Sequence, residues 1–77
     1  MTTLMEPKRT TTAVAKVIEI TAESSESFED AIRHGIEKAS DTVHEIRSAW
    51  VDGQQVRVED GKVVAFRVDL KVTFVLD

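Results

Sequence analysis

The sequence predicts a small α+β domain in which one helix lies across a three-stranded antiparallel sheet. Three observations predict it: an apolar stripe at three- and four-residue spacing, a long alternation of apolar and polar residues near the end, and an Asp-Gly pair between two extended segments. At 77 residues the chain has room for one domain. A domain of this size buries only about 60% of its unfolded surface, so we expect it to work as a homo-oligomer.

The composition is that of an ordinary globular protein, with 42% hydrophobic and 31% charged residues. Cysteine is absent, which excludes disulfides, thiolate metal sites and cysteine nucleophiles. A formal net charge of −4 and scattered basic residues argue against nucleic-acid binding. No apolar run approaches the ~20 residues that span a membrane, and residues 1–12 lack the apolar core of a signal peptide. We therefore expect a cytoplasmic protein with neither nucleic-acid nor membrane partners.

Residues 1–12 predict a flexible N-terminal arm, because they are rich in threonine and show no apolar periodicity. The folded domain is expected over residues 13–77. Its first strand is predicted from Val14 to Thr21, where β-branched residues partly alternate and Ile18 and Ile20 fall on one face.

A helix is predicted next. Ser24 or Ser25 offers an N-cap, and Glu26, Glu29 and Asp30 place negative charge in the first turn, where the helix dipole favours it.

The predicted helix carries one long apolar stripe that is expected to lie on the sheet. Its members are Phe28, Ala31, Ile32, Gly35, Ile36, Ala39, Val43 and Ile46. A glycine inside a helix costs about 1 kcal/mol relative to alanine. The presence of Gly35 in the stripe therefore indicates a close approach of the helix to a strand, with a tolerated flaw as the less favoured alternative.

Two further strands are predicted from the second half of the chain. Residues 47–58 form an extended segment in which Gly53 marks a bulge or bend. Asp60 and Gly61 then fit a two-residue type I′ turn, which needs positive φ at both central positions. From Val64 to Leu76 apolar and polar residues alternate with a period of two, which predicts the third strand.

One helix can cover only one face of such a sheet. The other face is predicted to carry Ser48, Trp50, Arg67, Asp69 and Lys71. An open face with the only tryptophan indicates an interface or a pocket: packing against a neighbouring copy is the first expectation for Trp50 and ligand stacking the second. The alternating charges fit either an interface ion-pair network or recognition of an anionic ligand through the arginine fork.

In this order and spacing, four segments resemble the dodecin family, from about Val17 to Leu76. They are S-S-E-S-F-E-D-A-I at Ser24–Ile32, K-A-S-D-T-V at Lys38–Val43, D-G-K-V-V-A-F-R-V at Asp60–Val68, and K-V-T-F-V-L at Lys71–Leu76. The resemblance implies the βαββ fold, a hollow homododecamer, and a storage role without catalysis. It also implies flavin binding at subunit contacts, on the sheet face away from the helix.

The resemblance also shows where this chain departs from flavin-binding dodecins. In those proteins a tryptophan stacks on the flavin ring and a glutamine bonds its polar edge. By spacing, these positions are Ser48 and Arg67 here, so both determinants are missing. Trp50 lies two residues beyond Ser48, about 6.6 Å along the strand. It is either a displaced stacking platform or the plug of an empty site.

The segments I-R-S-A-W-V and F-R-V-D-L-K-V-T-F look more like the divergent calcium-dodecin branch, which lacks the stacking tryptophan. Ca²⁺ takes six to eight oxygen ligands, and no loop in this chain supplies them alone. A carboxylate repeated around a symmetry axis would do so, with Asp52, Glu59, Asp60 and Asp69 as candidates. The alternative for each is a solvated charge or an ion pair, and the metal ligands stay open.

Nothing in the sequence indicates an enzyme: His34 and His44 are expected on the solvated side of the helix, with no nucleophile pattern nearby. The sequence predicts a non-enzymatic homododecamer that binds, stores or sequesters a small ligand at subunit interfaces. The ligand is flavin (FMN or riboflavin, bound weakly) or calcium, and Ser48, Trp50 and Arg67 are the predicted ligand-binding residues. The alternative is a purely structural assembly whose site is filled by Trp50 and Arg67.

Overall fold

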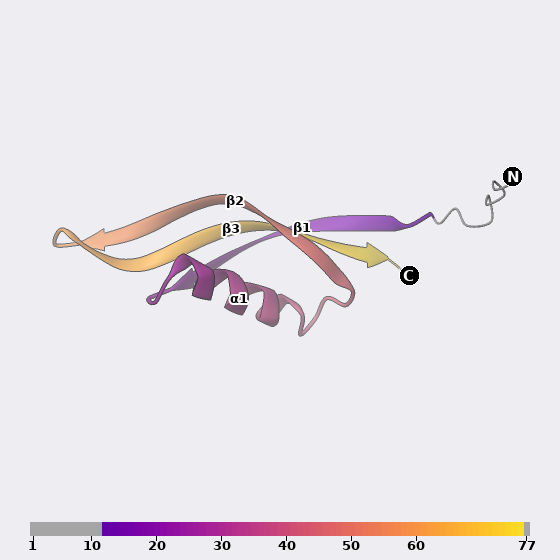
Figure 1. Cartoon of the computed structure of the whole chain (residues 1–77), viewed down its shortest axis with the longest axis horizontal. Helices are drawn as coiled ribbons and strands as arrows, with labels where there is room; N and C mark the ends of the chain where they lie inside the picture. The colour runs from indigo at the N-terminus through magenta and orange to yellow at the C-terminus, as the bar shows by residue number, and fades with distance from the viewer. Residues whose placement is uncertain (1–11, 77) are drawn as a thin grey trace, which may run out of the picture.

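The computed structural model describes residues 12–76, and the predicted arm therefore lies outside the described residues except for Thr12. Four elements follow one another: β1 (Val14–Ser24), α1 (Phe28–Ala39), β2 (Ile46–Glu59) and β3 (Lys62–Leu76) (Figure 1). The strands form one antiparallel sheet in the order β1-β3-β2. The predicted fold class, one helix on a three-stranded antiparallel sheet, is confirmed.

The core lies between α1 and the central strand β3. Val68, Leu70 and Val72 of β3 are at most 1% exposed, and Ala31 of α1 is fully buried against them. Partly buried residues from β1, α1 and β2 surround this centre: Ile18, Ile20, Ala22, Phe28, Ile32, Ile36 and Ile46. The long alternation of β3 thus places its apolar side chains under the helix, which leaves its polar ones on the opposite face.

The strands are longer than predicted at several ends. β1 continues past Thr21 because its pairing with β3 runs on to the pair Ser24 and Phe66. β3 begins at Lys62 rather than Val64, directly after the turn. In that turn φ is 53° at Asp60 and 76° at Gly61, so the predicted positive-φ turn is confirmed.

The predicted ends of the helix are wrong on both sides. The N-cap is Ser27, whose Oγ accepts a hydrogen bond of 2.9 Å from the backbone N–H of Asp30. The helix has 12 residues and ends at Ala39, so Val43 lies in the following loop and Ile46 in β2. Ile46 nevertheless packs on the same core. The apolar spacing continued past the helix because Ile46, at the start of β2, packs on the core that the helix also contacts.

The predicted irregularity at Gly53 is a β-bulge. The pairing of β2 with β3 shifts register between Val51 and Gly53, which leaves Asp52 as an extra residue. A bulge changes which alternate residues share a face, so Trp50 and Gln55 lie on the same face although their numbers differ by five. Further shifts occur between Ile46 and Ser48 and near Arg57.

No helix in the described part of the chain has both the length and the apolar character needed to cross a membrane.

Candidate functional site

The sheet face opposite α1, here called the outer face, carries all three residues predicted to bind a ligand. On this face β2 and β3 are paired as Ser48 with Thr73, Trp50 with Lys71, Gly53 with Asp69, and Gln55 with Arg67. Trp50 is 74% exposed, and Arg67 is half-buried because it lies on the central strand. The face is open because α1 covers only the other side (Figure 1).

The three predicted residues lie on one face but not at one point. At ~3.3 Å per residue along β3, the partner of Ser48, Thr73, is about 20 Å from Arg67. The partner of Trp50, Lys71, is about 13 Å from Arg67. Ser48 and Arg67 of one chain therefore cannot contact the same planar ring. A compact site that uses both positions needs residues from a second copy.

Arg57 crosses the outer face from β2 to β1. Its guanidinium lies 3.3 Å from Glu23 and 3.4 Å from Glu59, while its own partner on β3 is Ala65. Ala65 is only 3% exposed, although it lies on the same side of β3 as Arg67. We attribute this burial to the Arg57 side chain, which passes over Ala65 to reach Glu23.

The charges predicted to alternate along β3 do not pair with one another within the chain. Thr21 Oγ1 donates a 3.1 Å hydrogen bond to Asp69, and Lys71 Nζ lies 3.8 Å from Asp52. For Arg67 no hydrogen bond or ion pair of the side chain exists within residues 12–76. Arg67 is thus a half-buried cation without a bonded partner in the described chain.

The candidate metal ligands do not assemble within one chain. Across the described residues, no three His, Asp or Glu side chains are grouped so that they could hold a metal ion. Asp52 faces Lys71, and Glu59 faces Arg57. A calcium site built from these carboxylates therefore needs more than one copy.

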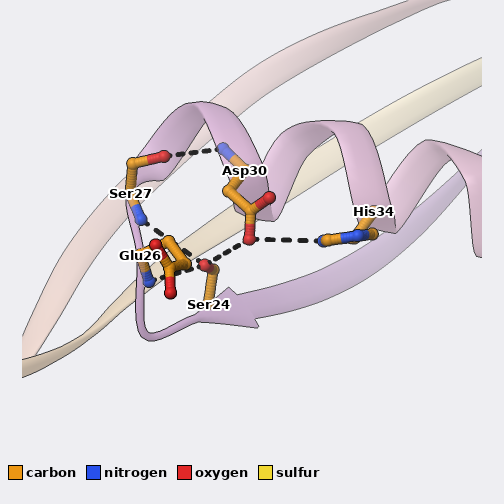
Figure 2. Close-up of polar contacts among 5 residues, drawn as sticks. All are labelled: Ser24, Glu26, Ser27, Asp30 and His34. Atoms are coloured by element: carbon orange, nitrogen blue, oxygen red, sulfur yellow. Dashed lines mark hydrogen bonds and ion pairs between the residues drawn. The ribbon is translucent and has the colours of Figure 1, made fainter.

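A serine, an aspartate and a histidine meet where β1 leads into α1 (Figure 2). Ser24 Oγ donates a 2.6 Å hydrogen bond to Asp30 Oδ2, and His34 Nδ1 lies 3.3 Å from the same oxygen. The aspartate is in the middle, so the histidine cannot take the serine proton as it would in a hydrolase triad. Ser24 Oγ also accepts the backbone N–H of Glu26 at 2.8 Å, which makes the cluster a helix cap.

The cap lowers the pKa of Asp30. The hydrogen bond from Ser24 is the main cause, partial burial opposes it, and the positive charge of His34 adds to it. A carboxyl whose pKa falls on folding stabilises the fold fully above its ordinary pKa, and this contribution is lost as the pH drops through the lowered value. The sequence predicted solvated roles for both histidines and missed this contact, since Ser24 is ten residues from His34 and on another element.

We expect Ser24→Ala to lower the free energy of unfolding at pH 7 by about 1–2 kcal/mol, because a buried hydroxyl that serves two backbone N–H groups and Asp30 is lost. The pKa of Asp30 should rise toward its ordinary value, which NMR titration measures. Ser25→Ala, at the exposed neighbouring position, is the control and should change stability by less than about 0.5 kcal/mol. An unchanged Asp30 pKa in Ser24→Ala would contradict the assignment.

The chain is a small α+β binding protein. One helix covers one face of its sheet, and the other face is open, mixed in charge and carries an exposed tryptophan. Residues 14–77 match the family model described as Dodecin. The chain belongs to the dodecin family.

Relatives agree in sequence and in structure. The calcium dodecin of Mycobacterium tuberculosis is 36% identical over 62 residues, which are 80% of this chain and 87% of that protein. Its crystal structure, described as that of a calcium-chelating antigen with a calcium-binding site, matches 83% of this chain and 91% of its own, with 37% identity and a TM-score of 0.73. Dodecin from Streptomyces davaonensis is 33% identical, with a TM-score of 0.83 over 87% of this chain and 98% of its own. The predicted resemblance is confirmed.

Proposed function

We propose that this dodecin is a hollow homododecamer that binds and stores a small ligand at contacts between copies, without catalysing a reaction. One observation carries the proposal: Trp50 is 74% exposed on the open outer face. An indole in this position offers a flat apolar platform, and burying it requires either a ligand or another copy.

The site must be closed by a second copy. A planar ligand stacked on Trp50 of one chain alone would keep its second face in water, whereas ligand sites usually bury most of the ligand surface. Apolar side chains are also exposed well away from Trp50, at 60% for Val14 and 56% for Val58. Assembly covers such surfaces and adds the burial that a small domain cannot supply alone.

A flavin-type ligand fits this platform best. The ring would stack on Trp50, because Ser48 has no aromatic group at the position that flavin-binding dodecins use. Stacking on one aromatic platform contributes about 0.5–1.5 kcal/mol beyond area burial, so modest affinity is expected.

Titration with riboflavin and FMN tests the proposal, and the only tryptophan makes protein fluorescence a direct probe of Trp50. We expect both flavins to quench it. Trp50→Ala should weaken binding about 2- to 10-fold, measured from flavin fluorescence. Val51→Ala, the next residue but on the helix side of β2, is the control. Light scattering should give a mass near twelve subunits for all three proteins.

Two outcomes would contradict the flavin proposal. If the parent protein assembles but neither flavin quenches its tryptophan fluorescence, the ligand is not flavin. If Trp50→Ala breaks the assembly instead of weakening the ligand, Trp50 packs between copies, and the purely structural assembly filled by Trp50 and Arg67 becomes the better account.

Calcium is the second candidate, favoured by the 36% identity to a protein named calcium dodecin. Within the described residues of one chain, no three acidic or histidine side chains lie together so that they could hold a metal ion. The ion would therefore take the same carboxylate from several copies. The same preparations, melted in CaCl₂ and in MgCl₂ of equal concentration, test this candidate. Binding to the folded state raises the melting temperature, so a rise with calcium alone is expected. Equal curves would exclude a calcium-specific site.

A further inference from the structure

We propose that the hairpin of β2 and β3 docks in the groove between β1 and α1 of a second copy, where the free edge of β2 pairs with the free edge of β1. The contact joins two different surfaces of the chain, so it is heterologous and can close into a ring of copies. It rests on the proposed function only in that copies associate. Both surfaces are separate from the outer face, which carries the proposed ligand.

The end of the hairpin is an apolar surface that its own chain leaves uncovered. α1 has 12 residues and β3 has 15, so the helix spans about 18 Å of a sheet about 50 Å long. Phe28, the first residue of α1, contacts Phe66, and the hairpin projects beyond this point (Figure 1). On its helix side Val56, Val58 and Val63 are each at least 39% exposed. Three neighbouring exposed valines indicate a contact surface.

The surface that fits this hairpin is an open groove of about 420 Å³ between β1 and α1. Its apolar lining comes from Ile20 and Ala22 of β1 and from Gly35 and Ala39 of α1. Because β1 is an edge strand, the groove lies beside unpaired backbone groups. A strand added at this edge would point its helix-side valines into the groove.

The two strands that would meet both have a free edge. The order β1-β3-β2 leaves one side of β1 and one side of β2 unpaired within residues 12–76. β1 pairs with β3 without a register shift from Val14 to Ser24, and β2 does so over residues 53–57. Neither stretch contains a proline or a bulge, which are common protections of a sheet edge. Pairing these edges would continue the sheet from one copy into the next.

The two surfaces also carry opposite charges. Lys38 and His34 line the α1 side of the groove, and Lys38 makes no ion pair within residues 12–76. Glu23 lines the β1 side, but its carboxylate lies 3.3 Å from Arg57. At the tip of the hairpin Asp60 is exposed and makes no ion pair in the described chain. Lys38 is in the last turn of α1 and the hairpin projects past the first, so the two charges can meet only between copies.

Val58→Lys tests the contact, because it brings a cation to the place where Lys38 of the second copy is proposed to lie. We expect the variant to stay folded by circular dichroism, and its mass by light scattering to fall at least about twofold from that of the parent. Adding Lys38→Glu to the variant should restore the mass. Lys62→Glu makes the same charge change beside Val58 in the same hairpin, and this control should not restore it.

Cysteine cross-linking gives a second readout, in a chain without natural cysteine. Gln55→Cys is combined in turn with Glu19→Cys, Thr21→Cys and Glu23→Cys. Within one chain β3 separates these strands by about 9.6 Å, too far for a disulfide, so only two copies can be joined. We expect covalent oligomers from at least one pair under oxidising conditions. Each single variant, and Ser48→Cys at the far end of β2 in place of Gln55→Cys, should give none.

Rescue by Lys38→Glu, or cross-links confined to the Gln55 pairs, supports the contact, and the cross-links decide if Val58→Lys does not fold. An assembled Val58→Lys without any cross-link overturns the inference, while the proposed function stands with a different contact. Dissociation without rescue or cross-links also overturns it, because the hairpin then docks elsewhere. A monomeric parent chain defeats both proposals. If the contact is found but neither flavin nor calcium binds, the inference stands and the proposed ligands fail.

Discussion

Leu70→Ala is expected to lower the free energy of unfolding by about 2–5 kcal/mol, the range for removing a fully buried leucine side chain. Leu70 is 1% exposed at the centre of β3. The backbone of α1 is close to this side chain, because one Cδ atom of Leu70 lies 3.4 Å from where a Cβ on Gly35 would be. The helix and the sheet cannot easily move together to fill the space, so the cost should lie in the upper part of that range.

Denaturant unfolding at one fixed protein concentration measures this effect, since the stability of an oligomer depends on concentration. Leu76→Ala is the matched control, because Leu76 is on the same strand and the same side but is 46% exposed. Its loss should be several-fold smaller. Equal losses for the two variants would mean that Leu76 is as deeply buried in the assembly as Leu70 is in the chain.

Gly35→Ala should lower the free energy of unfolding by about 1–3 kcal/mol, the usual cost of overpacking, although alanine favours a helix by about 1 kcal/mol over glycine. The added Cβ would lie 2.9 Å from the Cβ of Ala22. Neither atom is the end of a flexible side chain, so the helix itself must move away from β1. Clash and intrinsic helix propensity therefore act in opposite directions, and the geometry predicts that the clash is larger.

A double-mutant cycle with Ala22→Gly separates the two effects. In the Ala22→Gly background the obstructing Cβ is absent, so Gly35→Ala should become neutral or stabilising. Thermal melts of the four proteins measure the coupling. If Gly35→Ala stabilises the parent chain as well, the close contact relaxes at little cost, and Gly35 is not required by the packing of α1 on β1.

The parts of the fold that the sequence predicted are those set by local chemistry. The period of two in β3 identified Val68, Leu70 and Val72 as core, because one buried face imposes that period on a central strand. The Asp60-Gly61 turn followed from its need for positive φ. Gly35 indicated a close approach rather than a tolerated flaw, because glycine inside a helix costs about 1 kcal/mol relative to alanine.

The errors came from features that tertiary contacts decide. The helix was predicted to continue with Val43 and Ile46, because their spacing happens to match that of a helix and Ile46 packs on the same core from β2. The N-cap was predicted at Ser24 or Ser25 instead of Ser27, since all three serines have the same local preference. Ser24 contributes to the cap from the end of β1, through a contact that only the fold creates.

The sequence predicted where the candidate site lies on the sheet, but it did not predict all of the residues on that face. Ser48, Trp50 and Arg67 lie on the open face, as the alternation indicated, while their role in ligand binding stays a prediction. Gln55 and Arg57 were not predicted on this face, because a bulge at Gly53 leaves open which residues beyond it share the face of Trp50. The closure of the site depends on other copies, which no pattern within one chain determines.

Because of the bulge at Asp52, the alternation of inward and outward residues in β2 reverses at that position. From Ser48 to Val51 the even-numbered residues lie on the outer face, and from Gly53 to Arg57 the odd-numbered ones do. Deleting Asp52 or a residue next to it would remove the bulge and leave the alternation on both sides in place. Deleting a residue farther along β2 would instead exchange the faces of the stretch between that residue and Asp52. Single-residue insertions and deletions can therefore rewrite this surface more completely than any substitution, and alignments of the outer face between relatives must be anchored at this position.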